Sequence, residues 1–584
     1  MNRLVWVVSA LLTSGLYGWT QGVEPLDPSA VNPKPVQPRR SKNVDRPKVV
    51  RSPEGDKPLI ASNPTLAIKG VIIVKSMAEI QENGVPNATG IVVKDIPFLA
   101  GWAAHPEPPF LGRTLTENAI RDIQESIILY CREHGKLLVD VILPEQNIES
   151  GVLQLWFLEG KVEKLTVKNE GKKWFKDKFI LSQVRLHPGD GLDSNQLNQD
   201  LNWLNNNPFR RVDVNFKPGG KLGLTEVDLE VQDRFPVRPY LGYENSGTRF
   251  THPDRLLAGL NWGNAFGLDH QFNYQYSTDL EFDLVKAHSA SYIAPLPWRH
   301  SLMVYGSYVD ARAEFPGGTT ADGHSWQTSA RYSVPLPEIA KYRHEVSVGF
   351  DFKRSDNNLL SGGTTVLQDS ETDVAQFVVG YSGALPDPYG RSSFGLEFNY
   401  SPGGLTSNNK SAEFENLRKG TKADYFYARL NVTRLTRLPW DFSWVLNGWA
   451  QLATERLLPS EELALGGYNT IRGYDERVLT GDEGWILSNE IRSPALPLGN
   501  ITGIRDAKDE LQVLGFFDCG GARVIDPTGA DGANPNKTLA SVGAGMRYTV
   551  GRNLSFRLDY GFPLMEKSIN ERSSRVHLGA LLSF

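Results

Sequence analysis

The sequence is poor in the residues that carry covalent cross-links and metal sites. Its 584 residues include two cysteines, Cys131 and Cys519, and ten histidines. We assign the two cysteines to different parts of the chain, which excludes a disulfide framework and leaves a metal site without its ligand spacing. We therefore expect two packed thiols, no metal and no cofactor.

Catalytic and nucleotide-binding motifs are missing too. The sequence contains no HExxH, no GxSxG and no phosphate-binding GxxxxGK[ST] segment, and its histidines are scattered. Its 62 basic residues balance 67 acidic ones without a large basic block. An enzyme and a nucleic-acid-binding protein are therefore both disfavoured.

The N-terminal 22 residues, MNRLVWVVSALLTSGLYGWTQG, are predominantly apolar. A positive start at Arg3 precedes an apolar run from Leu4 to Leu12, and small residues follow. This pattern predicts a signal peptide over residues 1–22, because it is too short for a transmembrane helix. A buried helix is the alternative, but no amphipathic pattern continues it.

Residues 23–65 carry many prolines and almost no apolar periodicity. Nine prolines lie between Val23 and Pro64, with charged residues among them. Such a composition does not bury a core. It predicts an extended linker.

A first compact segment, residues 66–161, has the order strand, helix, strand, strand. A β-branched run from Ile68 to Val74 opens it, and the alternating stretches LLVDVIL and GVLQLWFLEG close it. We expect Thr114 or Thr116 to cap the helix between them and Gly135 to end it. The apolar stripe of this helix consists of Ala119, Ile120, Ile123, Ile127 and Tyr130.

A second segment, residues 162–235, repeats this order. The strand KVEKLTVKN precedes a helix around SNQLNQDLNWLNNN and the strands RRVDVNFKPG and TEVDLEVQD. The chain therefore carries two small α/β modules in tandem.

From Pro236 to Phe584 the pattern changes to strict alternation. In HQFNYQYST, aromatic residues alternate with Gln and Asn, and HEVSVGFDF, FYARLNVT, LSFRLDYGF and RVHLGALLSF behave alike. Seven short turns separate pairs of strands: GLD at 267, APLPW at 294, VPLPE at 334, ALPDP at 384, RLPW at 437, SPALP at 493 and GRN at 551.

Seven turns on one side and eight longer connections on the other require sixteen strands. The 349 residues then give about 22 per strand and connection, which suits membrane-crossing strands of roughly ten residues. Trp298 and Trp440 lie at turns, where an aromatic girdle is expected. We predict an all-β transmembrane barrel of sixteen antiparallel strands over 236–584. A large soluble all-β protein is the alternative.

One long connection, residues 454–484, contains LGGYNTIRGYDERVLTGDEGW. If this loop folds into the barrel, Arg472 needs an anion, because an unpaired buried charge is costly. Asp518 is the candidate on the inner face of a later strand, with Asp559 as a second acidic candidate. The alternative is a solvated arginine and a carboxylate that hydrates the lumen.

The segments IRGY (471–474) and FFDCG (516–520) resemble the paired motifs of the outer-membrane insertase and translocase superfamily that includes BamA. In that superfamily the arginine loop enters the barrel and pairs with an aspartate of the inner wall. The resemblance implies these roles for Arg472 and Asp518. The other motif positions are Ile471, Gly473, Tyr474, Phe516 and Gly520.

The upstream modules resemble the two polypeptide-transport-associated (POTRA) domains of TpsB transporters, the haemolysin secretion/activation proteins such as ShlB, FhaC and HecB. The segments LLVDVILPEQNIESGVLQLWFLEGKVEKL and LNNNPFRRVDVNFKPGGKLGLTEVDLEV carry this likeness, most specifically at Asn207, Pro208 and Arg210. Two departures stand out. Residues 23–64 lack the apolar stripe of the helix that often plugs the barrel in this family. Residues 77–112 form a connection after the first strand that is longer than is usual in the family.

The resemblance implies two-partner secretion across the outer membrane of a Gram-negative bacterium, with the POTRA domains in the periplasm. The implied partners are an unfolded TpsA-like exoprotein, outer-membrane lipid and, during biogenesis, the barrel assembly machinery. Phe584 would end the C-terminal barrel signal. An insertase for other barrels is the main alternative, and a passive porin is a further one.

Overall fold

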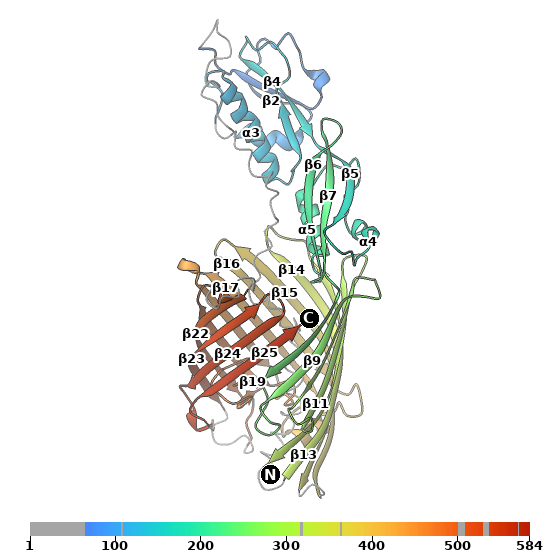
Figure 1. Ribbon diagram of the computed structural model, residues 1–584, viewed down its shortest axis with the longest axis vertical. Helices are drawn as coiled ribbons and strands as arrows, with labels where there is room; N and C mark the ends of the chain where they lie inside the picture. Colours follow the sequence, from blue (N-terminus) through green and yellow to red (C-terminus); the bar gives the residue numbers. More distant parts are fainter. Residues whose placement is uncertain are drawn as a thin grey trace. The chain divides into compact units, whose positions relative to one another are not determined.

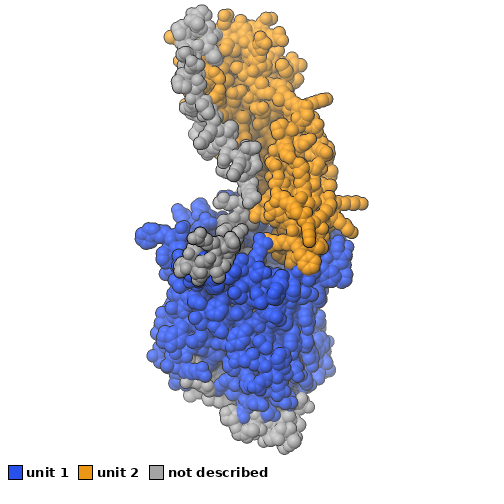
Figure 2. Space-filling model, viewed as in Figure 1, with its two compact units in different colours: residues 1–34, 236–584 blue, residues 35–235 orange. Residues whose placement is uncertain are grey.

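A computed structural model describes most of the chain after residue 64. The described residues are 65–106, 109–315, 319–361, 365–499, 509–528, 536–569 and 572–584. The predicted signal peptide and nearly all of the predicted linker lie outside them. The chain divides into two compact units at residue 235, and they are coloured separately in Figure 2.

The first α/β module has a four-stranded sheet in the order β2-β1-β4-β3. Strands β1 and β4 are parallel to each other in the sheet centre and β2 is parallel to β1, whereas β3 is antiparallel to β4. Its elements are β1 (Gly70–Val74), β2 (Gly90–Val93), α2 (Ala100–Ala104), α3 (Glu117–Glu133), β3 (Val139–Ile142) and β4 (Val152–Glu159). The strand pattern did not predict β2 and α2, which lie in the long connection 77–112.

Helix α3 forms where the apolar stripe predicts it. The Thr116 hydroxyl accepts a hydrogen bond from the amide of Ala119 at 3.1 Å, which caps the N-terminus. Gly135 follows the helix with φ of +88°, a conformation that favours glycine. The helix packs its apolar face on the sheet (Figure 1), burying Ile123 and Ile127 completely.

The second α/β module has a three-stranded sheet in the order β5-β7-β6. Its elements are β5 (Lys161–Asn169), α4 (Asp177–Ser182), α5 (Ser194–Leu204), β6 (Arg210–Pro218) and β7 (Leu224–Asp233). Helix α5 ends three residues earlier than its sequence pattern predicts. The reason is Asn205, whose side chain bonds instead to the amide and carbonyl of Val212 on β6, at 2.7 and 2.9 Å.

The remaining unit is a closed barrel of sixteen antiparallel strands (Figure 1), which confirms the predicted fold. The last strand, β25, pairs with the first, β8, and closes the cylinder. The strands are β8 (Val237–Glu244), β9 (Arg255–Ala265), β10 (His270–Thr278), β11 (Val285–Pro295), β12 (Ser301–Phe315), β13 (Thr319–Pro335), β14 (Arg343–Ser361), β15 (Thr365–Asp387), β16 (Gly390–Pro402), β17 (Asp424–Arg437), β18 (Ser443–Ala453), β21 (Glu483–Arg492), β22 (Asp509–Arg523), β23 (Lys537–Val550), β24 (Leu554–Pro563) and β25 (Arg575–Ser583).

Side chains alternate between the two faces of the barrel wall. On β22, Val513 and Phe517 are about half exposed on the outside, whereas Phe516 and Asp518 are buried on the inside. The same alternation places Leu430 outside and Tyr427 inside on β17. A strand between lipid and a polar lumen requires this pattern.

Several strands are longer than the ten residues expected. Strands β13, β14 and β15 have 17, 19 and 23 residues. Strand β15 continues through Asp387, so most of the segment ALPDP belongs to the strand and the turn lies at Pro388 and Tyr389. Within the described residues, no helix is long and apolar enough to cross a membrane.

Candidate functional site

The connection between β18 and β21 folds inside the barrel. It spans residues 454–482, two fewer than expected, because β21 begins at Glu483. A small hairpin, β19 (Leu463–Leu465) with β20 (Leu479–Gly481), shapes its middle. The carboxylate of Asp482 accepts from the Leu457 amide at 2.9 Å and so holds the two ends of the loop together. We call residues 454–482 the lumen loop.

Arg472, at the tip of the lumen loop, lies against the inner wall with only 2% of its surface exposed. Its Nε and Nη2 donate to the two oxygens of Asp518 at 2.7 and 2.8 Å, a bidentate pair. The Arg472 amide also donates to Asp518, at 3.2 Å. The two residues that the sequence pairs are thus in direct contact; their role in transport stays a prediction.

Further groups around the guanidinium complete its surroundings. Nη1 donates to Glu490 at 2.6 Å, and Nη2 donates to the Ser488 hydroxyl at 3.2 Å. The guanidinium carbon lies 3.7 Å from the centre of the Phe516 ring, a cation–π contact. A charge removed from water is stable only when it is paired and hydrogen-bonded in this way.

The neighbours of Arg472 in the loop motif are packed against the wall. Gly473 has φ of +91°, and a Cβ there would lie 2.8 Å from the carbonyl carbon of Gly561. The Tyr474 hydroxyl donates to the Ala540 carbonyl at 2.9 Å. Ile471 is fully buried, and a Cβ on Gly520 would approach it to 3.1 Å. The small residues therefore let the loop backbone lie directly on the strands.

Asp559 belongs to a neighbouring ion cluster. Its carboxylate is bonded to Arg547 and Arg557, each at 2.7 Å, whereas its shortest approach to Arg472 is 3.6 Å. Asp559 thus contributes a longer-range charge to the Arg472 site. It is not the direct partner.

Three residues of the site were not singled out from the sequence. Ser488 and Glu490 lie on β21, and His577 on β25 accepts from the Gly473 amide at 3.0 Å. For Ser488 and Glu490 the sequence does carry a signal, because the alternation along β21 places both side chains on the inner face of the barrel. His577 offers no such signal, because a single histidine in an alternating strand does not indicate its partner.

The motif in the second α/β module stabilises the fold of that module. The buried Asn207 side chain accepts from the Phe209 amide at 3.0 Å. The buried Arg210 side chain donates to the Leu204 carbonyl, at the end of α5, and its guanidinium lies 4.7 Å from the Phe175 ring centre. Pro208 is exposed. These contacts join the end of α5 to the start of β6.

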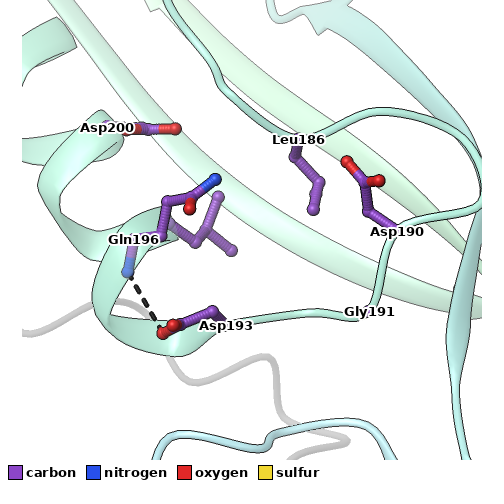
Figure 3. Close-up of a pocket in the computed structure, with 7 residues that line it drawn as sticks. Leu186, Asp190, Gly191, Asp193, Gln196 and Asp200 are labelled. Atoms are coloured by element: carbon purple, nitrogen blue, oxygen red, sulfur yellow. Dashed lines mark hydrogen bonds between the residues drawn. The ribbon is translucent and has the colours of Figure 1, made fainter.

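A cavity of about 250 Å³ lies in the same module (Figure 3), lined by Leu186, Asp190, Gly191, Asp193, Gln196, Leu197 and Asp200. Its three carboxylates already have structural partners. Asp190 accepts from the His187 amide at 2.8 Å. Asp193 caps α5 through the Gln196 amide, and Asp200 accepts from Arg185. In the part of the chain that the structure describes, no group of His, Cys, Asp and Glu has the arrangement of a metal site.

The C-terminal residue helps close the barrel. The Phe584 amide donates to the Pro239 carbonyl on β8 at 3.1 Å, next to the seam between the last and first strands. Its side chain is 65% exposed. Both cysteines are free thiols, with Cys131 buried in the first module.

Comparison with known proteins supports the relationship suggested by these motifs. The family model of the haemolysin secretion/activation protein ShlB/FhaC/HecB matches residues 223–548, more than half of the chain. The outer membrane transporter CdiB of Dickeya dadantii is 25% identical over 67% of this chain and 70% of its own length. The heme/hemopexin transporter protein HuxB of Haemophilus influenzae is 21% identical over 82% of this chain and 84% of its own.

Solved structures show the same fold. CdiB from Escherichia coli aligns with a TM-score of 0.69 at 17% identity, covering 91% of this chain and 94% of its own. BamA from Haemophilus ducreyi lacking POTRA domains 1-3 aligns with a TM-score of 0.50 at 13% identity, covering 86% and 100%.

The two α/β modules are POTRA domains in the periplasm, and the barrel lies in the outer membrane. The match over residues 223–548 includes most of the barrel and both wall and loop motifs. The chain therefore belongs to the haemolysin secretion/activation family ShlB/FhaC/HecB, whose members are outer-membrane transporters.

Proposed function

We propose that this protein secretes one large TpsA-type exoprotein through its barrel, after the POTRA domains capture the unfolded client in the periplasm. The observation that carries the proposal is the lumen loop, whose buried Arg472 fastens it to Asp518 on the inner wall. A conduit for an unfolded chain must stay closed between clients, and an ion-paired loop inside the lumen provides a closure that can be displaced.

The POTRA domains offer a sheet edge for capture. Strand β6 forms one edge of the second sheet over nine residues, Arg210–Pro218. An extended chain can add to such an edge, because backbone hydrogen bonds give affinity without requiring one particular sequence. The barrel wall then offers a polar route through a bilayer that rejects unpaired backbone groups.

Transport needs no catalytic step in this scheme, and we assign the protein no enzymatic activity and no cofactor. A passive porin would need neither periplasmic domains nor an anchored loop. The family relationship favours a dedicated transporter over an insertase of other barrels. The barrel assembly machinery enters only as the partner that inserts this protein itself.

The test is a comparison of culture supernatant and outer membrane with and without the gene. We expect one large exoprotein to disappear from the medium while the amounts of other barrels stay constant. A general fall in outer-membrane barrels would instead identify an insertase and overturn the proposal. Complementation with the wild-type gene should restore the exoprotein.

A further inference from the structure

Besides Arg472, a buried ion pair with the barrel wall holds the lumen loop near its first end. It lies next to Glu462, which pairs with Arg418 of the connection between β16 and β17 at 2.8 Å. Lys353 on β14 donates to the two carboxylate oxygens of Glu461 at 2.9 and 3.1 Å. The side chains are 7% and 0% exposed. Glu461 lies in the first third of the lumen loop, eleven residues before the tip arginine.

Other wall residues complete the surroundings of Glu461. Its carboxylate accepts from the Tyr427 hydroxyl at 2.7 Å and from the Gln376 amide at 3.4 Å. Its backbone carbonyl accepts from Arg429 at 3.0 Å and from Gln451 at 2.9 Å. Both the side chain and the backbone of this loop residue are therefore bonded to the wall.

The two anchors use different parts of the barrel. Glu461 is held by residues of β14, β15, β17 and β18, whereas Arg472 is held by residues of β21 and β22. In the order of strands around the closed barrel, β22 lies six positions beyond β14. The loop thus contacts two adjoining sectors of the inner wall, which meet where β18 pairs with β21.

We propose that Glu461 and Lys353 are positioning residues that hold the lumen loop independently of Arg472 and Asp518, so that the loop leaves the lumen only when both anchors are released. These two anchors deepen the proposed function, because they name the contacts that keep the pore closed. The proposal rests on that function in one respect, namely that the barrel is the conduit.

The physical reason is the behaviour of a chain attached at two points. When one contact breaks, the other keeps the detached group close to its partner, and the high effective concentration makes it bind again quickly. Loss of one anchor therefore removes both its own contact and this mutual support, and the loop is then held by the other anchor alone. Loss of both anchors frees the loop, but the combined effect is smaller than the product of the two separate effects, because the mutual support is lost only once.

The barrel offers a matched control. Arg434 on β17 and Asp387 on β15 form an ion pair in the wall, with side chains 22% and 29% exposed. Arg434 also donates to the hydroxyls of Ser392 and Thr436, so its bonds go to residues outside both anchors. Arg434→Met therefore tests the effect of losing an ion pair of the wall as such.

The experiment measures the open fraction of the purified full-length protein in planar lipid bilayers. We expect Glu461→Gln and Arg472→Ala each to raise the open fraction more than about threefold, and the double variant to be more open than either single variant but less open than the product of the two effects. Arg434→Met should stay at the wild-type value. A double variant no more open than Arg472→Ala alone would overturn the proposal.

A charge swap separates pairing from local damage. The double substitution Lys353→Glu and Glu461→Lys restores the ion pair with its charges exchanged. When this swap is added to Arg472→Ala, we expect the same open fraction as for Arg472→Ala alone. A swap as open as the Glu461→Gln, Arg472→Ala variant would contradict the pairing. Heat-modifiable gel mobility verifies that each barrel is folded. Because no client is present, failure here is distinct from failure of the secretion test.

Discussion

At the scale of single residues, the cost of burying charge governs the Arg472 site. The guanidinium is 2% exposed and has carboxylate partners in Asp518 and Glu490, with the Phe516 ring on its face. Removing one partner of a buried pair typically costs roughly 3–5 kcal/mol, because the other charge stays buried and unpaired. The docked loop is therefore sensitive to single substitutions.

Arg472→Ala should lower export of the exoprotein while the barrel still inserts. The substitution removes the charge that docks the loop tip, so the closed state that receives a client is less populated. Asp518→Asn should weaken docking by roughly 3–5 kcal/mol and lower export similarly. Secreted and membrane fractions from the same culture measure both effects.

Arg523 on the same strand as Asp518 is the control for this prediction. It pairs with Glu483, but its side chain is 63% exposed, and such surface pairs contribute roughly 0–1 kcal/mol. Arg523→Ala should export normally. Wild-type export by Arg472→Ala would refute the role of the loop tip.

Gly473→Ala should displace the loop tip although it changes no charge. Its φ of +91° disfavours a side chain, and the added Cβ would lie 2.8 Å from Gly561. Gly404 is a matched glycine with φ of +72° and open space around its Cβ position. We expect Gly473→Ala to raise bilayer conductance and Gly404→Ala to leave it unchanged. Equal conductance of the two variants would show that the close contact does not matter.

At the scale of elements, one carboxylate joins all three strands of the second POTRA sheet. Asp228 on β7 is bonded to Lys168 on β5 and Lys217 on β6, both at 2.6 Å, and to the Thr166 hydroxyl. Burial alone would raise the pKa of Asp228, but the hydrogen bonds from the two lysines outweigh it and hold this pKa below its usual range.

The stability of this sheet should therefore fall in acid. A folded-state pKa below that of the unfolded chain gives stability that is complete above the unfolded pKa, about 3.9, and is lost as the pH falls below it. We expect the urea midpoint of the POTRA domains, followed by fluorescence of the full-length protein, to drop between pH 7 and pH 3. Asp228→Asn should show a smaller drop, and an equal drop would exclude this carboxylate as a cause.

The elements that the sequence predicts are those with a local signal. The sixteen strands are predicted from segments that alternate between lipid and lumen and from the spacing of the turns, which carry prolines such as Pro295 and Pro439. Strand β2 and helix α2 are too short to show a period. The early end of α5 depends on Asn205 bonding to β6, a tertiary contact that helix propensity does not encode.

At the scale of the whole molecule, contacts between distant segments limit what the sequence reveals. The sequence predicts Arg472 and Asp518 as a pair, because both lie in motifs and both are expected to face the lumen. Lys353 and Glu461 are 108 residues apart, and neither lies in such a motif. A buried carboxylate in a loop that enters a lumen requires a cation, but only the closed barrel shows which strand supplies it.

The most direct consequence of the proposed function is that the client passes through the lumen of this barrel. Strand β17 allows a matched test, because its neighbouring residues Asn431 and Leu430 are both exposed but belong to opposite faces of the wall. A photo-crosslinking amino acid at each position should therefore report on the lumen and on the lipid side, respectively. During active export we predict adducts with the exoprotein from position 431 and none from position 430. Normal export without adducts at position 431, or with equal adducts from both positions, would show that the client does not pass through this lumen.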